Sequence, residues 1–223
     1  MLADYKVSFI EFLLDAGVLK FGDFIAKSGR KLPYFINAGE IKTGDQICKL
    51  GEYYAKCYKE NIKADNVVLY GPAYKGIPLA VSAASALARE GVDLPFFFNR
   101  KEVKDHGEGG IFVGYKPNAG QNVVIVEDVI TAGTAIRESI ELMKTLEGVT
   151  INAVMIMVNR MEKGLGEISA MKEIELQHGF PVYSIVTVYE IIEYLEAHPE
   201  RMSDPDCITR IREYLSVYGA KDE

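Results

Sequence analysis

The sequence predicts an α/β fold, with an open and mostly parallel sheet flanked by helices. Two features of the 223 residues predict it: short apolar runs alternate with amphipathic stretches, and the central apolar runs are β-branched without polar alternation. Runs of this kind mark strands that are covered on both faces, as in parallel sheets. Hydrophobic residues make up 48% of the chain, and no linker or internal repeat divides it. We therefore expect a single domain over residues 1–223.

The N-terminal part predicts two helices and a pair of strands. Val7–Leu14 is expected to be helical because its apolar residues recur on one face. Phe21–Ile25 and Tyr34–Asn37 are predicted strands on either side of the turn Ser28–Lys31. Gly44–Tyr58 is a predicted helix, because an acid lies near its start and its apolar residues follow the helical spacing.

The rest of the chain predicts a series of strand–helix units. Each predicted strand is a short apolar run, and the helices between them are amphipathic or rich in alanine. The predicted strands are Val67–Tyr70, Leu94–Phe98, Val123–Val126, Ala153–Val158 and Val182–Val188. The predicted helices are Ile77–Arg89 and Thr134–Leu146. Sheets of this class bind ligands at the carboxyl ends of their strands, so we expect the chemistry in the loops there.

Composition argues against several classes of protein. The chain has 25 Lys and Arg against 32 Asp and Glu, a net charge of −7, which argues against a general nucleic-acid binder. Cys48, Cys57 and Cys207 show no CxxC spacing, so we expect neither a disulfide framework nor a thiolate zinc site. No apolar stretch reaches the roughly 18 residues of a membrane span, and the N-terminus has no secretory pattern. We expect a cytoplasmic protein that binds neither nucleic acid nor membranes.

The most informative stretch is Val123–Ala135. Its strand ends in two carboxylates, Glu127 and Asp128, and the following turn, rich in small residues and hydroxyl groups, opens a helix. The N–H groups of Thr131–Thr134 can surround a phosphate beside the helix N-terminus, and Gly133 allows a close approach. The stretch is neither a Walker loop nor a GxGxxG motif. Paired acids beside a phosphate site suggest a ribose 5-phosphate; the alternative is an ordinary turn with solvated acids.

Two other loops carry positive charge. The lid segment, Arg100–Gly114, combines four glycines with four cationic or potentially cationic side chains, which suits a lid that closes on a polyanion. Those side chains are Arg100, Lys101, Lys104 and His106. A solvated polar loop is the alternative, and His106 alone would more often be a surface histidine. The glycine loop, Gly71–Gly76, joins a strand to a helix, where Lys75 can face a pyrophosphate. A tight turn with an exposed lysine is an alternative interpretation of equal weight.

Together these motifs resemble the type I phosphoribosyltransferases, which bind 5-phosphoribosyl 1-pyrophosphate (PRPP). Val123–Ala135 is similar to their ribose phosphate signature, and the glycine loop looks like their pyrophosphate loop, where the family has a non-proline cis peptide. Arg100–Gly110 and Lys27–Gly39 resemble the mobile loop and the N-terminal substrate segment of the orotate phosphoribosyltransferases within that family. The resemblance extends over about Phe9–Leu195.

The resemblance implies a PRPP site. The acid pair, Glu127 and Asp128, would hold the ribose 2′- and 3′-hydroxyls, and the turn Thr131–Ala135 would hold the 5′-phosphate. Glu127 stands where many relatives have Asp, and its longer arm still offers a carboxylate. The implied catalytic residues are Lys101, Lys104, His106, Glu127 and Asp128. The implied PRPP contacts are Lys27, Tyr74, Lys75, Arg100, Lys101, Lys104, His106, Glu127, Asp128, Val129, Ile130, Thr131, Ala132, Gly133, Thr134 and Ala135.

The resemblance also implies an orotate site. Arg160 follows a predicted strand, and a guanidinium can engage the orotate carboxylate through two hydrogen bonds. Taken singly, Arg160 and Lys27 would be ordinary surface cations. Phe35 and Ile36 would close over the pyrimidine ring, with Ile36 standing where a second aromatic is common. The implied orotate contacts are Lys27, Phe35, Ile36, Thr131 and Arg160.

The implied reaction transfers the phosphoribosyl group from PRPP to orotate, giving orotidine 5′-phosphate and pyrophosphate in pyrimidine (UMP) biosynthesis. Mg²⁺ is the implied cofactor, held mainly by PRPP and water rather than by a protein cage. Members of the family are homodimers with shared active sites, in which the lid of one subunit completes the neighbour's site. The resemblance further implies a small hood, contributed by about residues 1–40 and 160–180.

Two alternative functions have to be distinguished from this one. A purine phosphoribosyltransferase would share the ribose phosphate signature but lack the lid sequence and the N-terminal substrate segment. A non-enzymatic PRPP sensor that binds nucleic acid is disfavoured by the net charge of −7 and the intact lid segment. The chain has no room for a fused decarboxylase barrel, which needs about 200 residues or more.

Overall fold

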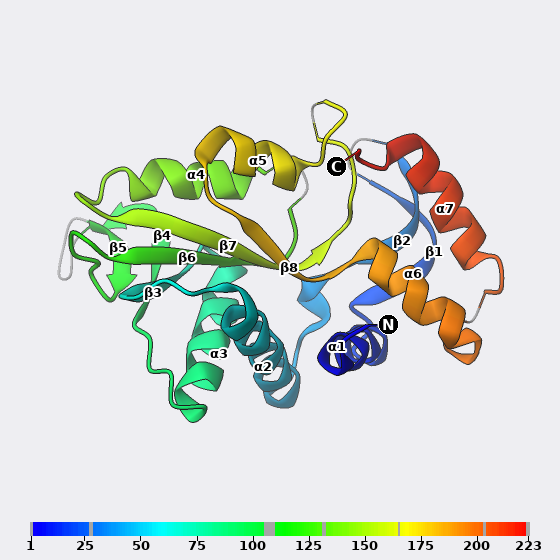
Figure 1. The fold of residues 1–223 in the computed structure, drawn as a ribbon, viewed down its shortest axis with the longest axis horizontal. Helices are drawn as coiled ribbons and strands as arrows, with labels where there is room; N and C mark the ends of the chain where they lie inside the picture. The colour runs from blue at the N-terminus through cyan, green and yellow to red at the C-terminus, as the bar shows by residue number, and fades with distance from the viewer. Residues whose placement is uncertain are drawn as a thin grey trace.

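A six-stranded sheet forms the centre of the protein (Figure 1). The computed structural model describes residues 2–26, 29–104, 110–130, 133–164, 166–202 and 204–221. The strand order is β5-β4-β3-β6-β7-β8, parallel throughout except for β5, which is antiparallel to β4. The strands are β3 (Val67–Gly71), β4 (Phe96–Lys104), β5 (Gly110–Gly114), β6 (Asn122–Glu127), β7 (Thr150–Asn159) and β8 (Val182–Thr187). The predicted open, mostly parallel α/β sheet is confirmed.

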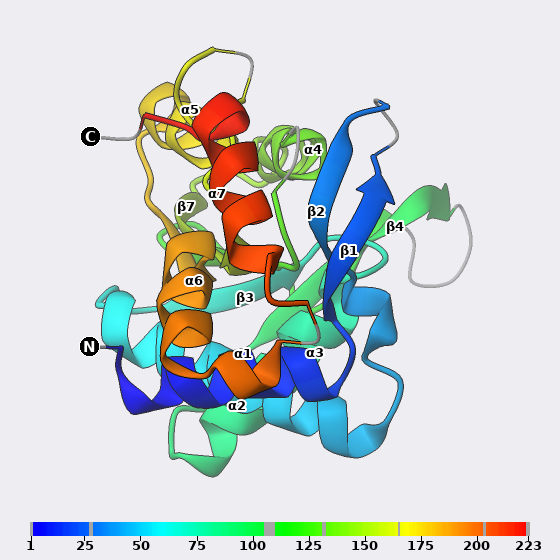
Figure 2. The same ribbon diagram turned by 90° about the vertical axis from the view of Figure 1, so that its right-hand side faces the viewer.

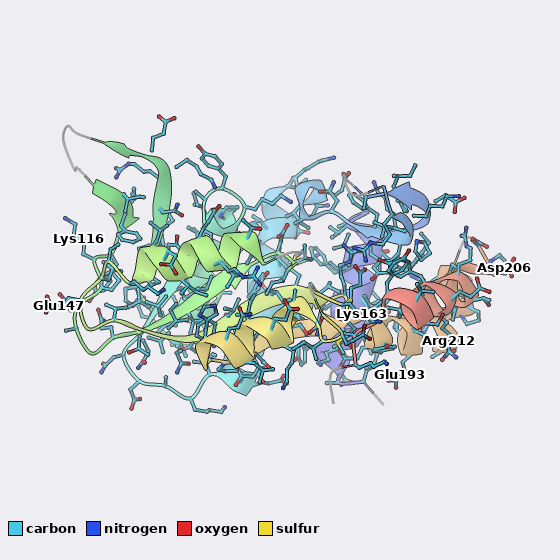
Figure 3. The ribbon with its side chains drawn as sticks, turned by 90° about the horizontal axis from the view of Figure 1, so that it is seen from above. Lys116, Glu147, Lys163, Glu193, Asp206 and Arg212 are labelled. Carbon is cyan, nitrogen blue, oxygen red and sulfur yellow. The ribbon has the colours of Figure 1, made fainter. Side chains whose placement is uncertain are left out.

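Helices cover both faces of this sheet. On one face lie α1 (Asp4–Asp15), α2 (Gly44–Asn61) and α3 (Gly76–Arg89) (Figure 1). On the other, α4 (Thr134–Met143) and α5 (Ala170–His178) lie side by side, as Figure 3 shows from above. Within the described ranges, no helix is both long and apolar enough to cross a membrane.

Alternating residues of the central strands serve the two helical layers. In β3, Val67 and Leu69 belong to the core under α2 and α3, whereas Val68 and Tyr70 belong to the core under α4 and α5. Because successive side chains of a strand point to opposite faces, a strand that is apolar at every position must be covered twice. The continuous apolar runs of the sequence follow from this burial.

A second, two-stranded sheet lies beside the main one. β1 (Leu19–Ile25) and β2 (Lys31–Ile36) pair antiparallel and face α7 (Cys207–Tyr218) (Figure 2). The chain after β7 is tied to the end of α7, since the Ala220 N–H donates to the Met161 carbonyl at 2.7 Å. Of the segments expected to form a hood, β1, β2 and residues 160–164 lie here, whereas α1 and α5 pack on the main sheet.

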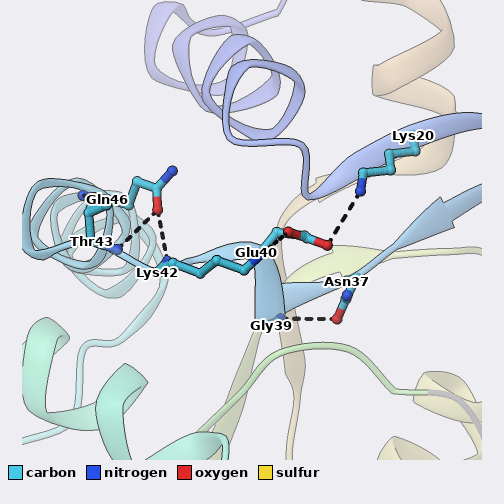
Figure 4. Close-up of polar contacts among 7 residues, drawn as sticks. All are labelled: Lys20, Asn37, Gly39, Glu40, Lys42, Thr43 and Gln46. Carbon is cyan, nitrogen blue, oxygen red and sulfur yellow. Dashed lines mark hydrogen bonds and ion pairs between the residues drawn. The ribbon is translucent and has the colours of Figure 1, made fainter.

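Short polar contacts stabilise the segment that connects β2 to α2 (Figure 4). Within the 3-10 turn η1 (Ala38–Glu40), the Glu40 carboxylate accepts from Lys20 of β1 at 3.3 Å and from Lys42 at 2.5 Å. Thr43 and Gln46 then form a capping box at the start of α2. The sequence analysis took the acid Asp45 as the sign of this helix start, and the structure shows that Thr43, two residues before it, is the cap.

Several elements differ from the prediction. The lid segment was expected to be a loop, but β4 continues through Arg100 to Lys104 and pairs with β5, so both arms are strand and only residues 105–109 lie outside the description. Strand pairing satisfies the backbone of a segment whose polar, glycine-rich composition favours a loop. Three helices were not predicted: α5, α7 and α6 (Val188–Ala197), which packs between α1 and α7.

Charged side chains mark the ends of the molecule. In the view from above, Lys116 and Glu147 lie at one end, and Asp206 and Arg212 of the α7 region lie at the other (Figure 3). Arg212 pairs with Glu196 of α6 at 2.5 Å. An exposed pair of this kind contributes little to stability.

Gly51→Ala should destabilise the protein, because a Cβ there would lie 2.4 Å from the Ser82 carbonyl oxygen, where α2 crosses α3. We expect the free energy of unfolding in urea to fall by about 2 kcal/mol, as for other overpacked cores.

Gly44→Ala in the same helix is the matched control. A Cβ at Gly44 meets nothing within 4 Å, so stability should change by less than about 0.5 kcal/mol. Equal unfolding midpoints for the two variants would contradict the close packing of α2 on α3.

Candidate active site at the carboxyl edge of the sheet

Four neighbouring strands bring their carboxyl ends to one edge of the sheet. In spatial order these are β4, β3, β6 and β7, all parallel. They lead into the lid segment, the glycine loop, the acid pair with its turn, and Arg160, respectively. The four segments that the sequence singled out therefore lie next to one another because of the strand order.

The acid pair is buried at the end of β6. Glu127 is 6% exposed and Asp128 is 7% exposed. The backbone beneath them is held from both sides: the Tyr54 hydroxyl donates to the Glu127 carbonyl at 2.5 Å, and the Met157 N–H donates to the Asp128 carbonyl at 2.8 Å. Burial and the two acids raise the pKa of Tyr54, so its hydroxyl stays protonated and donates. The strand end is a fixed platform for two carboxylates.

The two carboxylates have different partners. Asp128 accepts from the Val129 N–H at 2.7 Å and from the Lys75 ammonium at 3.0 Å. Glu127 accepts from the Asp128 N–H at 3.1 Å. Burial, followed by the repulsion from Asp128, raises the pKa of Glu127 to about 7. Near neutral pH the Glu127 carboxyl is therefore protonated in about half of the molecules, and a hydroxyl donor or a cation beside it would favour its ionised form.

The turn after the acid pair leads directly into α4. Gly133 adopts φ +72°, a left-handed conformation that favours glycine, and it has no side chain to cap the helix. The first N–H groups of α4, beginning at Thr134 and Ala135, therefore face the loop. Val129 and Ile130 are half-buried in the preceding stretch. Thr131 and Ala132 lie outside the described residues. A helix N-terminus with a glycine cap is suited to an anion.

The glycine loop packs tightly against β6. A Cβ on Gly71 would lie 2.2 Å from the Gly76 carbonyl oxygen, and a Cβ on Gly76 would lie 2.9 Å from the Val126 carbonyl oxygen. The peptide bond between Ala73 and Tyr74 is cis, as the resemblance led us to expect. Tyr74 is 70% exposed and free to meet a ligand. The close packing puts Lys75 within reach of Asp128, so the loop after β3 and the acid pair form one charged site.

The lid segment faces the start of α4 across a cavity. Arg100, Lys101 and Thr134 all line this space, whose volume is about 580 Å³. Arg100 donates to the Gly110 carbonyl at 3.2 Å and to the Phe112 carbonyl at 3.3 Å, so its guanidinium bridges the two arms of the lid. Lys101 is exposed. The side chain of Lys104 and all of His106 lie outside the described part of the chain.

A polar residue at the base of the lid escaped the sequence analysis. Asn99 is buried, and its side chain accepts from the Ala73 N–H of the glycine loop at 2.8 Å. It directly precedes the cationic run of the lid segment, but a single asparagine beside charged residues gives no signal in the sequence.

Arg160 lies in a cluster beside the β1–β2 sheet. We call this group of four residues the hood cluster: Arg30, Tyr34, Arg160 and Glu162. The Arg160 guanidinium pairs with Glu162 at 2.6 Å and lies over the Tyr34 ring, 5.4 Å from its centre. Tyr34 donates to Glu162 at 3.1 Å, and Arg30 pairs with the same carboxylate at 3.6 Å. Burial alone lowers the pKa of Arg160, but Tyr34 and Glu162 outweigh it and raise that pKa, so the group stays cationic. Sequence analysis missed Glu162.

The other predicted orotate contacts lie on β2. Phe35 is 41% exposed and stacks on Phe24 of β1, with ring centres 5.4 Å apart. Ile36, at the end of β2, is half-buried. Lys27 lies outside the described residues. Arg160 contacts the hood cluster and Phe35 contacts β1, whereas Lys75 contacts the acid pair. The structure therefore arranges the predicted residues as two groups.

Comparison with known proteins decides the family. The model of the phosphoribosyl transferase domain family matches residues 37–183. The chain is 50% identical over 221 residues to an orotate phosphoribosyltransferase of Clostridium botulinum (strain Alaska E43 / Type E3), covering 97% of this chain and 99% of that protein. The chain belongs to the orotate phosphoribosyltransferase family. An orotate phosphoribosyltransferase of Chromobacterium violaceum is 47% identical over 222 residues, covering 99% of this chain and 100% of that protein.

Solved structures of the orotate phosphoribosyltransferase family share this fold. The enzyme of Francisella tularensis superposes with a TM-score of 0.83 at 39% identity, covering 96% of this chain and 100% of that one. A Mycobacterium tuberculosis orotate phosphoribosyltransferase, solved with PRPP, has a TM-score of 0.62 at 19% identity, covering 83% of this chain and 98% of that one. The likeness to the second shows the fold alone.

The pKa of Glu127 predicts a pH dependence of stability. Its ordinary value is 4.5 and its value in the folded protein is about 7, so between these limits the folded state binds more protons than the unfolded chain. The contribution is complete below about pH 4.5 and is lost as the pH rises through about 7. The free energy of unfolding should fall by at most about 1.4 kcal/mol per pH unit in this window.

Glu127→Gln is the control, because its amide does not titrate. The difference in unfolding free energy between wild type and variant, measured in urea from pH 4.5 to 8, should shift against the wild type as the pH rises. A difference that is constant with pH would show that Glu127 titrates normally.

Proposed function

We propose that this chain transfers the 5-phosphoribosyl group from PRPP to orotate, giving orotidine 5′-phosphate and pyrophosphate in pyrimidine biosynthesis. The observation that carries the proposal is the buried acid pair at the end of β6, with Asp128 bonded to Lys75 and a helix that starts directly after Gly133. Close relatives named orotate phosphoribosyltransferases support the choice of orotate over a purine base.

The acid pair and the turn after it would bind the ribose phosphate part of PRPP. Glu127 and Asp128 offer acceptors for the 2′- and 3′-hydroxyls, and the Thr131–Ala135 turn offers N–H donors for the 5′-phosphate. Val129 and Ile130 would line the passage between them. A protein of this fold has been solved with PRPP, which supports this ligand.

Polar and cationic side chains on both sides of the site would bind the pyrophosphate. Tyr74 and Lys75 come from the glycine loop, and the lid segment supplies the others. The proposed lid contacts are Arg100, Lys101, Lys104 and His106. Arg100 bridges the arms of the lid through its Nη1, which leaves its Nη2 and Nε donors to contact pyrophosphate.

Mg²⁺ is the proposed cofactor. The described residues include no cluster of three or more metal-binding side chains, and Glu127 and Asp128 are the two carboxylates at this strand end. That donor set fits an ion carried mainly by oxygens of PRPP and water. The bound ion would neutralise charge on the departing pyrophosphate.

The hood cluster would recognise orotate. Arg160 is a half-buried cation that can form two hydrogen bonds to the orotate carboxylate, while Phe35 and Ile36 supply apolar cover for the ring. Lys27 and Thr131 complete the proposed contacts. Because Glu162 already pairs with Arg160, orotate would have to share this guanidinium with it.

The proposed chemistry is charge management rather than covalent catalysis. As the ribose C1 loses pyrophosphate it becomes oxocarbenium-like, and N1 of orotate adds to it. Lys101, Lys104 and His106 would stabilise the leaving group, and the acid pair would fix the ribose while the lid segment excludes water. We further propose a homodimer with shared active sites, in the cytoplasm, with no nucleic-acid or membrane partner.

The substrate can be tested by incubating the protein with Mg²⁺, PRPP and each of orotate, uracil and hypoxanthine. We expect consumption of orotate alone. Arg160→Gln should raise the KM for orotate by about a hundredfold, because a hydrogen bond between charged groups contributes about 1.5–3 kcal/mol.

Arg212→Gln, on the outer face of α7, is the control for this substitution and should leave the KM unchanged. Consumption of hypoxanthine instead of orotate would assign the chain to purine transfer.

Shared active sites can be tested by mixing two defective variants. Lys101→Ala should cost about 3 kcal/mol of transition-state stabilisation, the scale of one preorganised donor, and Asp128→Asn should be similarly impaired. If the lid of one subunit completes the neighbour's site, random exchange should restore about a quarter of wild-type activity, because half of the dimers then contain one intact site. Activity that stays at the level of the separate variants would show that each site is built by one chain.

A further inference from the structure

Asn99 lies where the main sheet turns into the lid. It is a residue of β4, pairs with Phe112 of β5 and directly precedes Arg100. Its exposed fraction is 8%, so its amide has little access to water. A buried amide is costly unless its donor and acceptor groups are bonded, so its partners indicate what it stabilises.

The partners of Asn99 come from three places. Its Oδ1 accepts from the Ala73 N–H at 2.8 Å and from the Tyr70 hydroxyl at 2.9 Å. Its Nδ2 donates to the Arg100 carbonyl at 3.1 Å. A backbone N–H can only donate, so the contact with Ala73 fixes which end of the amide is the oxygen.

These contacts join the two segments that we assign to pyrophosphate. Ala73 belongs to the glycine loop, which continues to Lys75 and its ion pair with Asp128. Arg100 begins the exposed arm of the lid segment and bonds to the opposite arm. Along the backbone the two segments are more than twenty residues apart. The Asn99 side chain links them, because it bonds both to the Ala73 N–H and to the Arg100 carbonyl.

We propose that Asn99 is a positioning residue that couples the glycine loop to the start of the lid segment, so that Lys75 on one side and Arg100 and Lys101 on the other converge on the same pyrophosphate. The proposal rests on the proposed function for the identity of the ligand. Asn99 does not touch the ligand itself; it acts by fixing the Ala73 amide and the start of the lid in one mutual geometry.

Both ends of the Asn99 side-chain amide are needed, the oxygen as an acceptor and the nitrogen as a donor. Alanine would leave the Ala73 N–H, the Tyr70 hydroxyl and the Arg100 carbonyl without this partner. Aspartate could accept from Ala73 and Tyr70, but it would present an oxygen to the Arg100 carbonyl and add negative charge beside the pyrophosphate site. Asn99→Asp should therefore impair PRPP binding more than Asn99→Ala does, although it preserves the shape of the side chain.

The test compares Asn99→Ala and Asn99→Asp with the control Tyr70→Phe. The control removes one hydroxyl but keeps the ring against Phe97, 4.8 Å between centres, and leaves both backbone contacts of Asn99 in place. The measurements are kcat, the KM for PRPP, the KM for orotate and the melting temperature of each variant.

We expect Asn99→Ala to raise the KM for PRPP about tenfold, the equivalent of about 1.4 kcal/mol, and Asn99→Asp to raise it further. The KM for orotate should change less than about twofold, because the hood cluster is not bonded to Asn99. Tyr70→Phe should have wild-type KM values even where its melting temperature falls.

Two outcomes separate the possible failures. If the Asn99 variants melt early but keep wild-type kinetic constants, Asn99 has a structural role only and the coupling is wrong. If the wild-type protein itself does not consume orotate with PRPP, the proposed function fails instead. Amide hydrogen exchange at Ala73 adds a measurement independent of activity: exchange should be faster in Asn99→Ala than in Tyr70→Phe, and equal rates would overturn the hydrogen bond on which the proposal rests.

Discussion

The hydrogen bonds that hold the end of β6 determine much of the arrangement around it. The Tyr54 hydroxyl reaches up from α2 to the Glu127 carbonyl, and the Met157 N–H of β7 bonds to the Asp128 carbonyl. The backbone of the acid pair is thereby fixed from the helical layer and from the neighbouring strand. The carboxylates, the Lys75 contact and the start of α4 all take their positions from these few residues, so preorganisation of the site begins with the strand and not with the loops.

The sequence predicted the parts of the fold whose burial is visible in a single stretch. β3, β6, β7 and β8 are apolar at nearly every position because both faces are covered. The outer half of β4, Arg100–Lys104, is strongly charged, and β5 is a short apolar run between two glycines, so their pairing with each other is not visible in either stretch alone. The start of α6 carries a signal in the sequence, the capping box of Thr187 and Glu190.

The site was predictable to the extent that its residues are neighbours along the chain. The acid pair, the turn after it and the glycine loop are each contiguous, and parallel strand order alone brings them to one edge. Asn99 and Glu162 were missed because their roles depend on partners from distant segments: Ala73 for the first, and Tyr34 with Arg30 for the second. A hydrogen bond between segments that are far apart along the chain produces no periodicity or residue spacing in the sequence, so it cannot be predicted from such patterns. The roles of the lid residues stay predictions.

The hood cluster has a consequence for how bases are told apart. Arg160 and Arg30 face a single carboxylate, Glu162, so two positive groups share one negative group. If the base binds here as proposed, a pyrimidine that brings one carboxylate of its own would balance this charge, whereas an uncharged pyrimidine of the same outline would leave one cation in excess. Selection among bases would then depend on the balance of charge at the cluster more than on the outline of the ring.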